Sequence, residues 1–384
     1  MKGKDTVPPI HRSSVFQFES LRVLSRAVKK DDYVYSRWRN PTVRTVEELL
    51  RNLEGAGDAL AFSSGMAAIT TLLLSLLKKS DRLLISKDVY GGTFQFVREM
   101  LPQWGVEVSW VDVDEKEKFL EGIQGDCRLV YIESPTNPLL RILPIKEIAD
   151  RAHRAGALLA VDGTFATPVN QSPLSLGADL VVHSASKFLG GHNDLIGGFV
   201  AGSRSVVENI GRTRRLLGGV MDPETAFLCW RGIKTLTLRT AAQSESAQKI
   251  AEYLASRTEV TRVWYPGLQS HPDFQLAQEQ MTGSGSIVSF ELRTTLRGIH
   301  KFIKSLTTIR LAPSLGGCDS LITHPASTSH AGLSKDDRRR AGIGNSLLRL
   351  STGLENTELL IKDLDGALRC IPKMSRRGSK RKGR

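Results

Sequence analysis

Several features that mark particular classes of protein are scarce in this sequence of 384 residues. It has four cysteines (Cys127, Cys229, Cys318 and Cys370), which lie far apart, without a CxxC pair or histidines at metal-ligand spacing. This pattern argues against a disulfide framework and against a structural metal site. We therefore expect reduced, buried thiols and no bound metal.

Long hydrophobic runs are also absent. The longest, Ile69–Leu77, covers nine residues and contains threonine and serine, so it is too short to cross a bilayer. The first 16 residues, MKGKDTVPPIHRSSVF, lack the apolar stretch of a signal peptide. We expect a cytoplasmic protein with no membrane partner.

Acidic residues are outnumbered, with 53 Lys and Arg against 40 Asp and Glu and a net charge of +13. Seven of the basic residues lie between Lys373 and Arg384, which contain no acid, so the rest of the chain carries +6. This basic tail could bind a polyanion such as RNA, but it has no interleaved aromatic residues and no fold motif for nucleic acid. A solvated, disordered end is the favoured interpretation, and no nucleic-acid partner is expected.

The remaining composition, 40% hydrophobic and 24% charged, is typical of a globular protein. Short apolar runs predict buried strands, and helical stretches separate several of them. The predicted strands are Ala59–Phe62, Arg82–Ser86, Val106–Asp112, Arg128–Ser134, Ala157–Asp162, Asp179–His183 and Gly198–Ala201, and the helices include Met66–Leu77, Gly92–Gln103 and Ile145–Ala155. This alternation predicts an α/β fold with a mainly parallel sheet, covered on both faces, that binds ligands beyond the carboxyl ends of its strands.

The pattern changes after about residue 235, where a long amphipathic helix, Thr237–Ser256, is predicted. A strand at Ser286–Glu291 and a helix at Gly298–Leu306 follow, which indicates a smaller α+β domain. We therefore divide the chain into an extended N-terminal arm (1–45), a large domain (46–235), a small domain (236–372) and the basic tail (373–384).

Candidate functional groups follow the predicted strands. Ser63-Ser64-Gly65-Met66 leads into a helix, which suits an anion site at a helix N-terminus but is explained equally well by a serine N-cap. Asp162 ends a strand, as structural carboxylates often do. Lys187 follows the next strand, beside Ser184 and Ser186, and is either a solvated charge or an amine suited to Schiff-base chemistry.

The glycines near Lys187 (Gly190, Gly191, Gly197 and Gly198) could belong to simple turns. Taken together, however, an anion cup, an acid 25 residues before a lysine, hydroxyls beside that lysine and an aromatic loop (Asp88-Val89-Tyr90) are the groups that pyridoxal phosphate requires. The acid would keep the pyridine nitrogen protonated, the aromatic side chain would stack on the ring, and the lysine would bind the aldehyde carbon.

Ordered motifs from about Pro8 to Leu368 resemble the cysteine/methionine-metabolism family of pyridoxal-phosphate enzymes, the trans-sulfuration enzymes. The family includes cystathionine γ-synthase, cystathionine γ-lyase and methionine γ-lyase. The matching stretches are Tyr35-Ser36-Arg37, Asn40-Pro41-Thr42, Ser63–Ala68, Asp88–Thr93, Glu133–Pro138, Val161–Pro168, Ser184–Asp194, Arg231–Leu236, Tyr265–Leu268, Ser314–Leu321, His324-Pro325-Ala326 and Arg349–Glu355. The resemblance implies fold type I, the aspartate-aminotransferase-like fold, and pyridoxal 5′-phosphate as cofactor.

The resemblance also implies a role for each matching residue. Lys187 is similar to the Schiff-base lysine, Asp162 to the partner of the pyridine nitrogen, and Tyr90 to the stacking tyrosine that can act as acid or base. Gly65, Met66, Ser184 and Ser186 match the phosphate cup, and Asn137 matches the residue near the cofactor's phenolic oxygen and the substrate carboxylate. Ser314 and Arg349 match the carboxylate clamp, with Asp319 also on the substrate side. Tyr35 and Arg37 match a pair that a neighbouring subunit contributes, which implies a homodimer within a homotetramer.

Departures from the family pattern bear on the reaction. Gly92 stands where methionine γ-lyases typically carry cysteine, and Leu315 where cystathionine β-lyases typically carry tryptophan, which argues against both activities. Asp319 replaces a glutamate that the synthase and γ-lyase branches both tend to have. The sequences of Gly163–Gln171 and Gly316–Ser320 resemble those of plant-type cystathionine γ-synthases. We expect γ-replacement on an activated homoserine with cysteine to give cystathionine. The alternatives are γ-elimination of cystathionine, methionine γ-lyase activity, or a non-catalytic protein of the same fold.

Overall fold

The structure, a computed structural model, describes residues 5–30, 32–332 and 335–372. Its helices are α1 (Leu21–Lys30), α2 (Pro41–Glu54), α3 (Gly65–Leu76), α4 (Gly91–Glu99), α5 (Lys116–Gly122), α6 (Ile145–Arg154), α7 (Thr167–Asn170), α8 (Arg204–Leu217), α9 (Pro223–Lys234), α10 (Leu236–Ala255), α11 (Phe274–Gln280), α12 (Leu296–Ser305), α13 (Lys335–Arg340) and α14 (Thr357–Arg369), with short 3-10 helices at Leu101–Trp104 and Pro325–Ser327. Its strands are β1 (Asp58–Phe62), β2 (Arg82–Ser86), β3 (Glu107–Val111), β4 (Cys127–Glu133), β5 (Leu158–Asp162), β6 (Leu180–Ser184), β7 (Gly198–Gly202), β8 (Val260–Trp264), β9 (Ile287–Leu292), β10 (Arg310–Leu311), β11 (Leu321–Thr323) and β12 (Leu347–Ser351).

The first seven strands form one sheet in the order β1-β7-β6-β5-β4-β2-β3. All neighbouring pairs are parallel except those of β7, which runs antiparallel to both β1 and β6. The predicted mainly parallel sheet is therefore confirmed, and each predicted strand lies within one residue of the observed one. The direction of β7 could not be read from its apolar pattern, because a buried strand looks the same in either direction.

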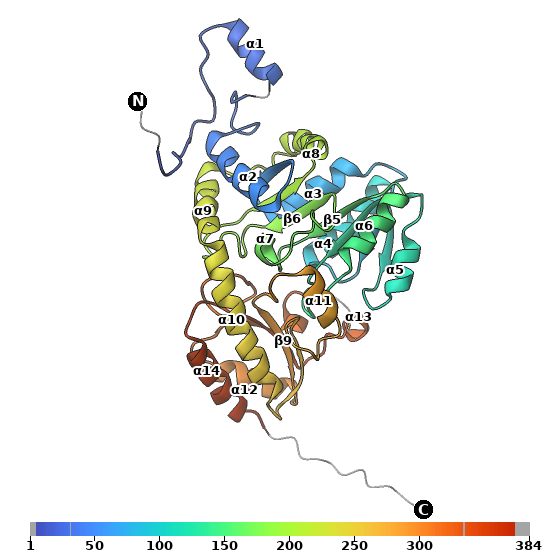
Figure 1. Cartoon of the computed structure of the whole chain (residues 1–384), viewed down its shortest axis with the longest axis vertical. Helices are drawn as coiled ribbons and strands as arrows, with labels where there is room; N and C mark the ends of the chain where they lie inside the picture. The colour runs from blue at the N-terminus through green and yellow to red at the C-terminus, as the bar shows by residue number, and fades with distance from the viewer. Residues whose placement is uncertain (1–4, 31, 333–334, 373–384) are drawn as a thin grey trace, which may run out of the picture.

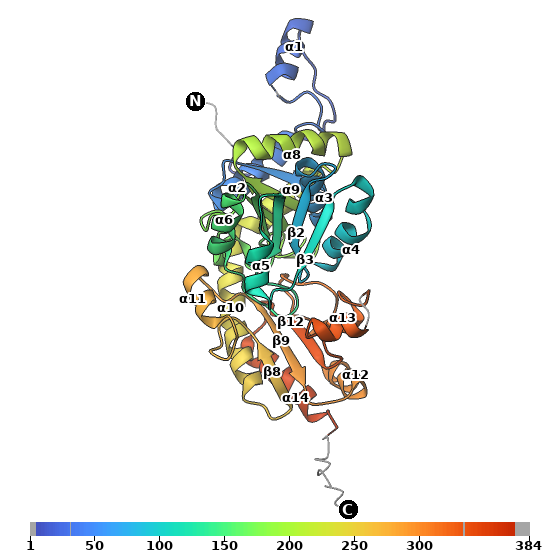
Figure 2. The same ribbon diagram turned by 90° about the vertical axis from the view of Figure 1, so that its right-hand side faces the viewer.

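Helices cover both faces of this sheet (Figure 2). Along β4, Leu129 and Tyr131 pack into a core that includes Leu72 of α3. The alternate residues Val130 and Ile132 pack with Ile148 of α6. Both sets are buried because successive side chains of a strand point to opposite faces, which explains the near-continuous apolar sequences of the central strands.

The carboxyl ends of three adjacent strands carry polar residues. In the strand register Glu133, the last residue of β4, lies opposite Asp162, the last residue of β5, and β6 ends beside them at Ser184. The order of the chain therefore brings together, at one sheet edge, groups that are about 25 residues apart in sequence.

The second sheet has five strands in the order β10-β11-β12-β9-β8. Helices α10, α12 and α14 pack with it around a core that includes Phe290 and Phe302, and α10 leads from the upper part of the molecule to the lower one (Figure 1). The helix predicted at Thr237–Ser256 and the strand at Ser286–Glu291 correspond to α10 and β9. The division of the chain at residues 235 and 236 stays a prediction.

The N-terminal arm differs from its prediction. It was expected to be extended through residue 45, but α1 forms at Leu21–Lys30, and α2 already begins at Pro41, where the Asn40 side chain accepts the backbone N–H groups of Thr42 and Val43. Asparagine before proline is a strong helix start. Figures 1 and 2 both show α1 projecting away from the body of the molecule. The predicted basic tail, residues 373–384, lies outside the described residues.

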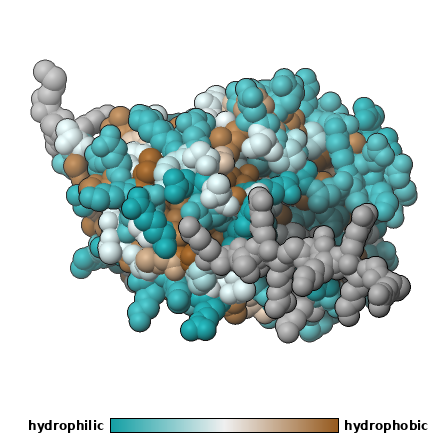
Figure 3. Space-filling view, turned by 90° about the horizontal axis from the view of Figure 1, so that it is seen from below, coloured by the Kyte–Doolittle hydropathy of each residue, from teal (hydrophilic) through white to brown (hydrophobic). Residues whose placement is uncertain are grey.

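No helix in the described ranges is long and apolar enough to cross a membrane. The end of the molecule that carries the second sheet shows mostly hydrophilic residues, with hydrophobic ones scattered among them (Figure 3).

Candidate active site

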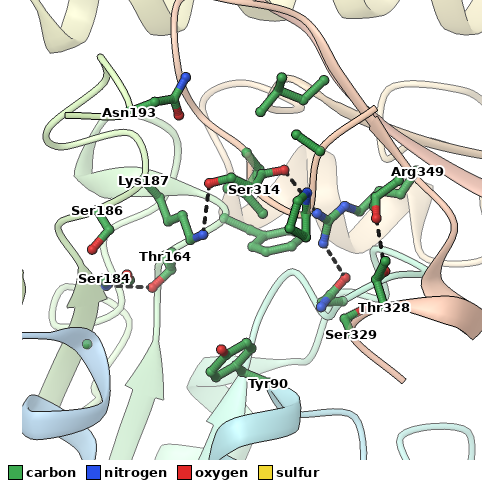
Figure 4. Close-up of a pocket in the computed structure, with 18 of the residues that line it drawn as sticks. Tyr90, Thr164, Ser184, Ser186, Lys187, Asn193, Ser314, Thr328, Ser329 and Arg349 are labelled. Carbon is green, nitrogen blue, oxygen red and sulfur yellow. Dashed lines mark hydrogen bonds between the residues drawn. The ribbon is translucent and has the colours of Figure 1, made fainter. Parts of the chain in front are cut away.

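A pocket of about 1110 Å³ lies between the carboxyl edge of the seven-stranded sheet and the segments of the second sheet. Asp162 lines it at the end of β5 and Lys187 just after β6, while Arg349 of β12 and Ser314, in the loop between β10 and β11, line it from the other side. Figure 4 shows Lys187 pointing toward Ser314, Arg349 reaching in from the other side, and Tyr90 facing them across the pocket. The pocket therefore joins residues from both halves of the chain.

Lys187 follows β6 and is largely withdrawn from solvent. Its Nζ donates a hydrogen bond to Ser314 Oγ at 3.0 Å. Burial, and then the charge of Arg349, lower the pKa of Lys187 to about 8. Because the free amine rather than the ammonium ion is the nucleophile and base, this environment favours proton transfer and covalent chemistry near neutral pH.

Asp162 is buried and well supplied with donors. Its Oδ1 accepts hydrogen bonds from Thr164 N at 3.0 Å and Thr164 Oγ1 at 2.6 Å, and the Tyr131 hydroxyl lies 3.5 Å from Oδ2. Burial raises the pKa of Asp162, while the Thr164 hydrogen bonds and the nearby His183 oppose the rise. Oδ1 accepts both Thr164 hydrogen bonds, whereas Oδ2 has only the long Tyr131 contact among the described residues and is the oxygen available to a cationic partner.

The N-terminus of α3 points its free amides into the pocket. Ser64 Oγ accepts the Ala67 N–H at 2.9 Å, so the serine N-cap is present. No acceptor within the described ranges takes the N–H groups of Gly65 and Met66, and the first turn of α3 has no acidic residue. The serine N-cap is therefore confirmed, and it leaves two N–H donors unused, so it is compatible with the anion site, which stays a prediction.

Glycine is required for this close approach. A Cβ on Gly65 would lie 3.1 Å from Ser184 Oγ, and a Cβ on Gly198 would lie 2.3 Å from Ser64 O. Ser184 and Ser186 line the pocket beside Gly65 and Met66. Two hydroxyls and two amides around an uncharged cradle match the donors that a phosphate ester needs.

Tyr90 lies in the loop between β2 and α4, with 47% of its surface exposed in the single chain. Its backbone N–H donates to Glu133 Oε2 at 2.7 Å. A Cβ on Gly92 would lie 2.7 Å from Tyr90 Cε1 and 3.0 Å from Met66 Sδ, so the ring packs directly over this glycine.

Arg349, on β12, is 4% exposed and makes a fixed set of contacts. Its Nη1 donates to Asn137 Oδ1 at 2.7 Å and its Nη2 to Ser314 O at 3.2 Å. Its buried Nε has no partner in the part of the chain that the structure describes. Burial lowers the pKa of Arg349 to about 10, with Glu133 opposing. A buried cation with an unused donor suits a carboxylate ligand.

Asp319 lies at the outer end of the pocket, where its Oδ1 is 3.7 Å from Arg310 Nη1. Both side chains are about half exposed or more, at 52% and 72%. This weak pair offers one negative and one positive group to a ligand.

Tyr35 and Arg37 lie outside this pocket. Arg37 Nη1 donates to the Arg215 carbonyl oxygen, and its guanidinium lies 5.4 Å from the Tyr35 ring. Within one chain they touch none of the groups above, so their contribution to a neighbouring site stays a prediction.

Sequence reasoning missed Thr164, Glu133 and Arg310 as residues of this site. Thr164 fixes Asp162 and also accepts the Ser184 N–H at 2.9 Å, and its position two residues after Asp162 was the available signal. Glu133 faces Asp162 across neighbouring strands, which only the strand register reveals. Across the described ranges, no group of three His, Cys, Asp or Glu residues could hold a metal ion.

The groups that line the pocket fit pyridoxal phosphate at three separate points: N–H and hydroxyl donors for the phosphate, a carboxylate acceptor for the ring N–H, and a lysine that can lose its proton. The fold and the site thus define an enzyme of fold type I that uses this cofactor. The model of the Cys/Met metabolism PLP-dependent enzymes matches residues 2–369, and the chain belongs to this family.

Similar proteins carry several activities. The chain is 42% identical over 361 residues to a cystathionine beta-lyase of Lactococcus lactis subsp. cremoris, covering 94% of this chain and 93% of that protein. It is 41% identical to a cystathionine gamma-lyase of Bacillus subtilis (90% and 91% covered) and 40% identical to the chloroplastic cystathionine gamma-synthase 1 of Nicotiana tabacum (95% and 68%). The solved structure of a cystathionine gamma synthase from Xanthomonas oryzae pv. oryzae with cystathionine matches with a TM-score of 0.90 at 38% identity, covering 94% and 92% of the two chains. These relatives act on carbon–sulfur bonds. Because their named reactions differ, the similarity does not decide which of these reactions this chain catalyses.

Proposed function

We propose that this enzyme catalyses γ-replacement: it joins an activated homoserine to cysteine and forms cystathionine. The pair of charges at the outer end of the pocket supports a site for a second amino-acid group. The Asp319 carboxylate and the Arg310 guanidinium offer opposite charges to the ammonium and carboxylate groups of a second amino acid, while Arg349 is placed for the first. A pocket of about 1110 Å³ has room for both. The resemblance of Gly163–Gln171 and Gly316–Ser320 to plant-type cystathionine γ-synthases, together with the tobacco relative, favours replacement over elimination.

Each residue would have a definite task in this reaction. Arg349, Asn137 and Ser314 would hold the α-carboxylate of the substrate. The bound cofactor supplies an electron sink for the charge left at the substrate α-carbon. Lys187, with its pKa lowered to about 8, would remove the α-proton and move protons at the β-carbon.

Two further residues would complete the chemistry. Tyr90 would lie over the cofactor ring and assist departure of the γ-substituent, and Asp162 would keep the ring nitrogen protonated. Gly65, Met66, Ser184 and Ser186 would bind the phosphate, with Tyr35 and Arg37 of a neighbouring subunit.

The second candidate is γ-elimination of cystathionine, which the Bacillus subtilis relative favours. The same outer pair would hold the cysteine half of that substrate, so geometry supports both. Methionine γ-lyase activity is less favoured, because the position that would carry a cysteine is Gly92, where a Cβ would press on Tyr90 and Met66.

One product assay separates these reactions. The purified, cofactor-loaded protein is given succinyl-, acetyl- or phosphohomoserine with cysteine, and in parallel cystathionine alone. We expect cystathionine from the first mixture. Formation of cysteine and 2-oxobutyrate from cystathionine would instead establish γ-elimination. Formation of homocysteine and pyruvate would establish β-elimination, the reaction for which the Lactococcus relative is named. Lys187→Ala, which lacks the amine, should give none of these products.

A further inference from the structure

Glu133 is a buried carboxyl group of the pocket for which the reaction above has no use. It is the last residue of β4, is 3% exposed and lines the pocket beside Asp162 and Asn137. A buried acid that faces a cofactor site must be held by specific partners, since an unsatisfied one would destabilise the fold.

Its principal partner is the backbone of Tyr90. Glu133 Oε2 accepts the Tyr90 N–H at 2.7 Å. Tyr90 is the residue before α4, and no side chain caps that helix. The contact ties the loop that leaves β2 to the end of β4, so it fixes the point from which the Tyr90 side chain projects.

The ring is confined from its other side by Gly92 and Met66. The space for a Cβ on Gly92 is already filled, since that atom would lie 2.7 Å from Tyr90 Cε1. With Glu133 behind the backbone and Gly92 beneath the ring, a shift of the Tyr90 amide would carry the ring with it.

The charges around Glu133 favour its role as a hydrogen-bond acceptor over a role as a fixed charge. Burial and the neighbouring carboxyl groups of Asp162 and Asp88 raise the pKa of Glu133 well above its usual value, whereas the Tyr90 N–H and Arg349 oppose the rise. The phenol of Tyr131 faces the same cluster. In this role a carboxyl oxygen of Glu133 accepts the Tyr90 N–H.

We propose that Glu133 is a positioning residue that holds the Tyr90 ring at the cofactor site by accepting the Tyr90 backbone N–H. The inference rests on the proposed place of Tyr90 over the cofactor. It is independent of the choice between γ-replacement and γ-elimination.

Two conservative variants separate the effect of the length of the Glu133 side chain from the effect of its ionisable group. Glu133→Gln keeps the chain length and a carbonyl acceptor but removes the ionisable group. Glu133→Asp keeps the ionisable group but is one methylene shorter, so it cannot reach the Tyr90 amide without movement of the loop. Both retain a polar side chain of similar volume, which favours folding. Glu121→Asp, at an exposed position on α5, is the matched control.

The readouts are the dissociation constant of pyridoxal phosphate, measured by titrating the apoenzyme, and the visible circular dichroism of the bound cofactor. We expect Glu133→Gln and Glu121→Asp to stay within about twofold of the wild type. Glu133→Asp should weaken cofactor binding about tenfold and reduce the visible dichroism, as loss of one buried hydrogen bond implies. An unimpaired Glu133→Asp, or a Glu133→Gln as impaired as Glu133→Asp, would overturn the proposal.

A double-mutant cycle with Tyr90→Leu tests whether Glu133 acts through Tyr90. In the Tyr90→Leu background Glu133→Asp should cause no further loss of cofactor affinity, because the ring that it positions is absent. Additive losses would show that Glu133 acts elsewhere. These measurements use no amino-acid substrate, so their failure is distinguishable from failure of the proposed reaction.

Discussion

Single residues at the site were predictable where each directly follows a strand. Asp162, Ser184 and Lys187 lie at or just beyond the ends of β5 and β6, and one rule about parallel sheets locates them all. The contacts that tune them were not predictable in this way. Thr164 and Glu133 act through pairings between chain segments, and the sequence does not state the register of those pairings.

The lowered pKa of Lys187 gives a prediction for that residue. At pH 7 a pKa of about 8 leaves about 10% of the side chains as free amine, against about 0.03% at the ordinary value of 10.5. We therefore expect Lys187 of the apoenzyme to react with an acylating reagent about a hundredfold faster than an ordinary lysine. The rate should rise with pH through about 8 and level off above about 9, where deprotonation is nearly complete.

Competitive labelling followed by mass spectrometry measures this rate for every lysine at once. Lys249 is an internal control, since it is exposed on α10 and its ion pair with Glu245 raises its pKa. If Lys187 and Lys249 were labelled at the same rate throughout the pH range, the environment described for Lys187 would be wrong.

At the scale of elements, the sequence was sufficient to predict amphipathic helices and strongly apolar strands. It was not sufficient to predict where α4 ends or that α1 forms. Helix α10 was expected within one residue because its buried face repeats over 20 residues. The predicted helix at Gly92–Gln103 stops at Glu99, and a 3-10 turn, Leu101–Trp104, replaces its end because Pro102 lacks the N–H that an α-helix needs. Helix α1 was missed, as only Ala27 of its residues is buried within the chain.

The turn after Lys187 provides a prediction for an element. Arg239 of α10 donates from Nη2 to Phe188 O at 2.9 Å and to Gly232 O at 2.8 Å, which ties the lysine turn to two helices. Gly191 has a φ of +75°, and a Cβ there would lie 2.1 Å from Arg239 Nη1. Gly191→Ala should thus lower the free energy of unfolding by about 2–4 kcal/mol, from backbone strain and from displacement of Arg239.

Gly156→Ala is a matched control for this substitution. Gly156 has the same φ of +75°, but nothing lies within 4 Å of a Cβ there. It should cost about 1 kcal/mol, the backbone part alone. Urea denaturation of both variants measures the difference, and equal losses would show that the packing of Arg239 against Gly191 contributes nothing.

At the scale of the whole molecule, the family and the fold were predictable, and both are confirmed by the match over residues 2–369. The reaction was not, since relatives about 40% identical are named as a β-lyase, a γ-synthase and a γ-lyase. The cytoplasmic location stays a prediction from the sequence, and the tobacco relative is chloroplastic.

The structure of a single chain does not show how subunits assemble. The N-terminal arm allows a test of one prediction about assembly, that each subunit contributes residues to the site of its neighbour. Tyr35 and Arg37 lie outside the pocket of their own chain, and they are predicted to complete the site of a neighbouring subunit. Two chains, one with Lys187→Ala and one with Arg37→Ala, are therefore co-expressed under different affinity tags, and the mixed species is purified. In such a dimer one site receives both defects and the other receives neither, so about half of the wild-type activity should remain.

The matched control places both substitutions in one chain and pairs it with a wild-type chain. If the arm acts on its neighbour, each site of this dimer has one defect, and its activity should be no higher than that of the single variants. If Arg37 served its own chain, the two results would be exchanged: the doubly substituted pairing would keep half of the activity and the first pairing none. Product formation in the two mixed species therefore decides, without a structure of the assembly, to which subunit the arm contributes.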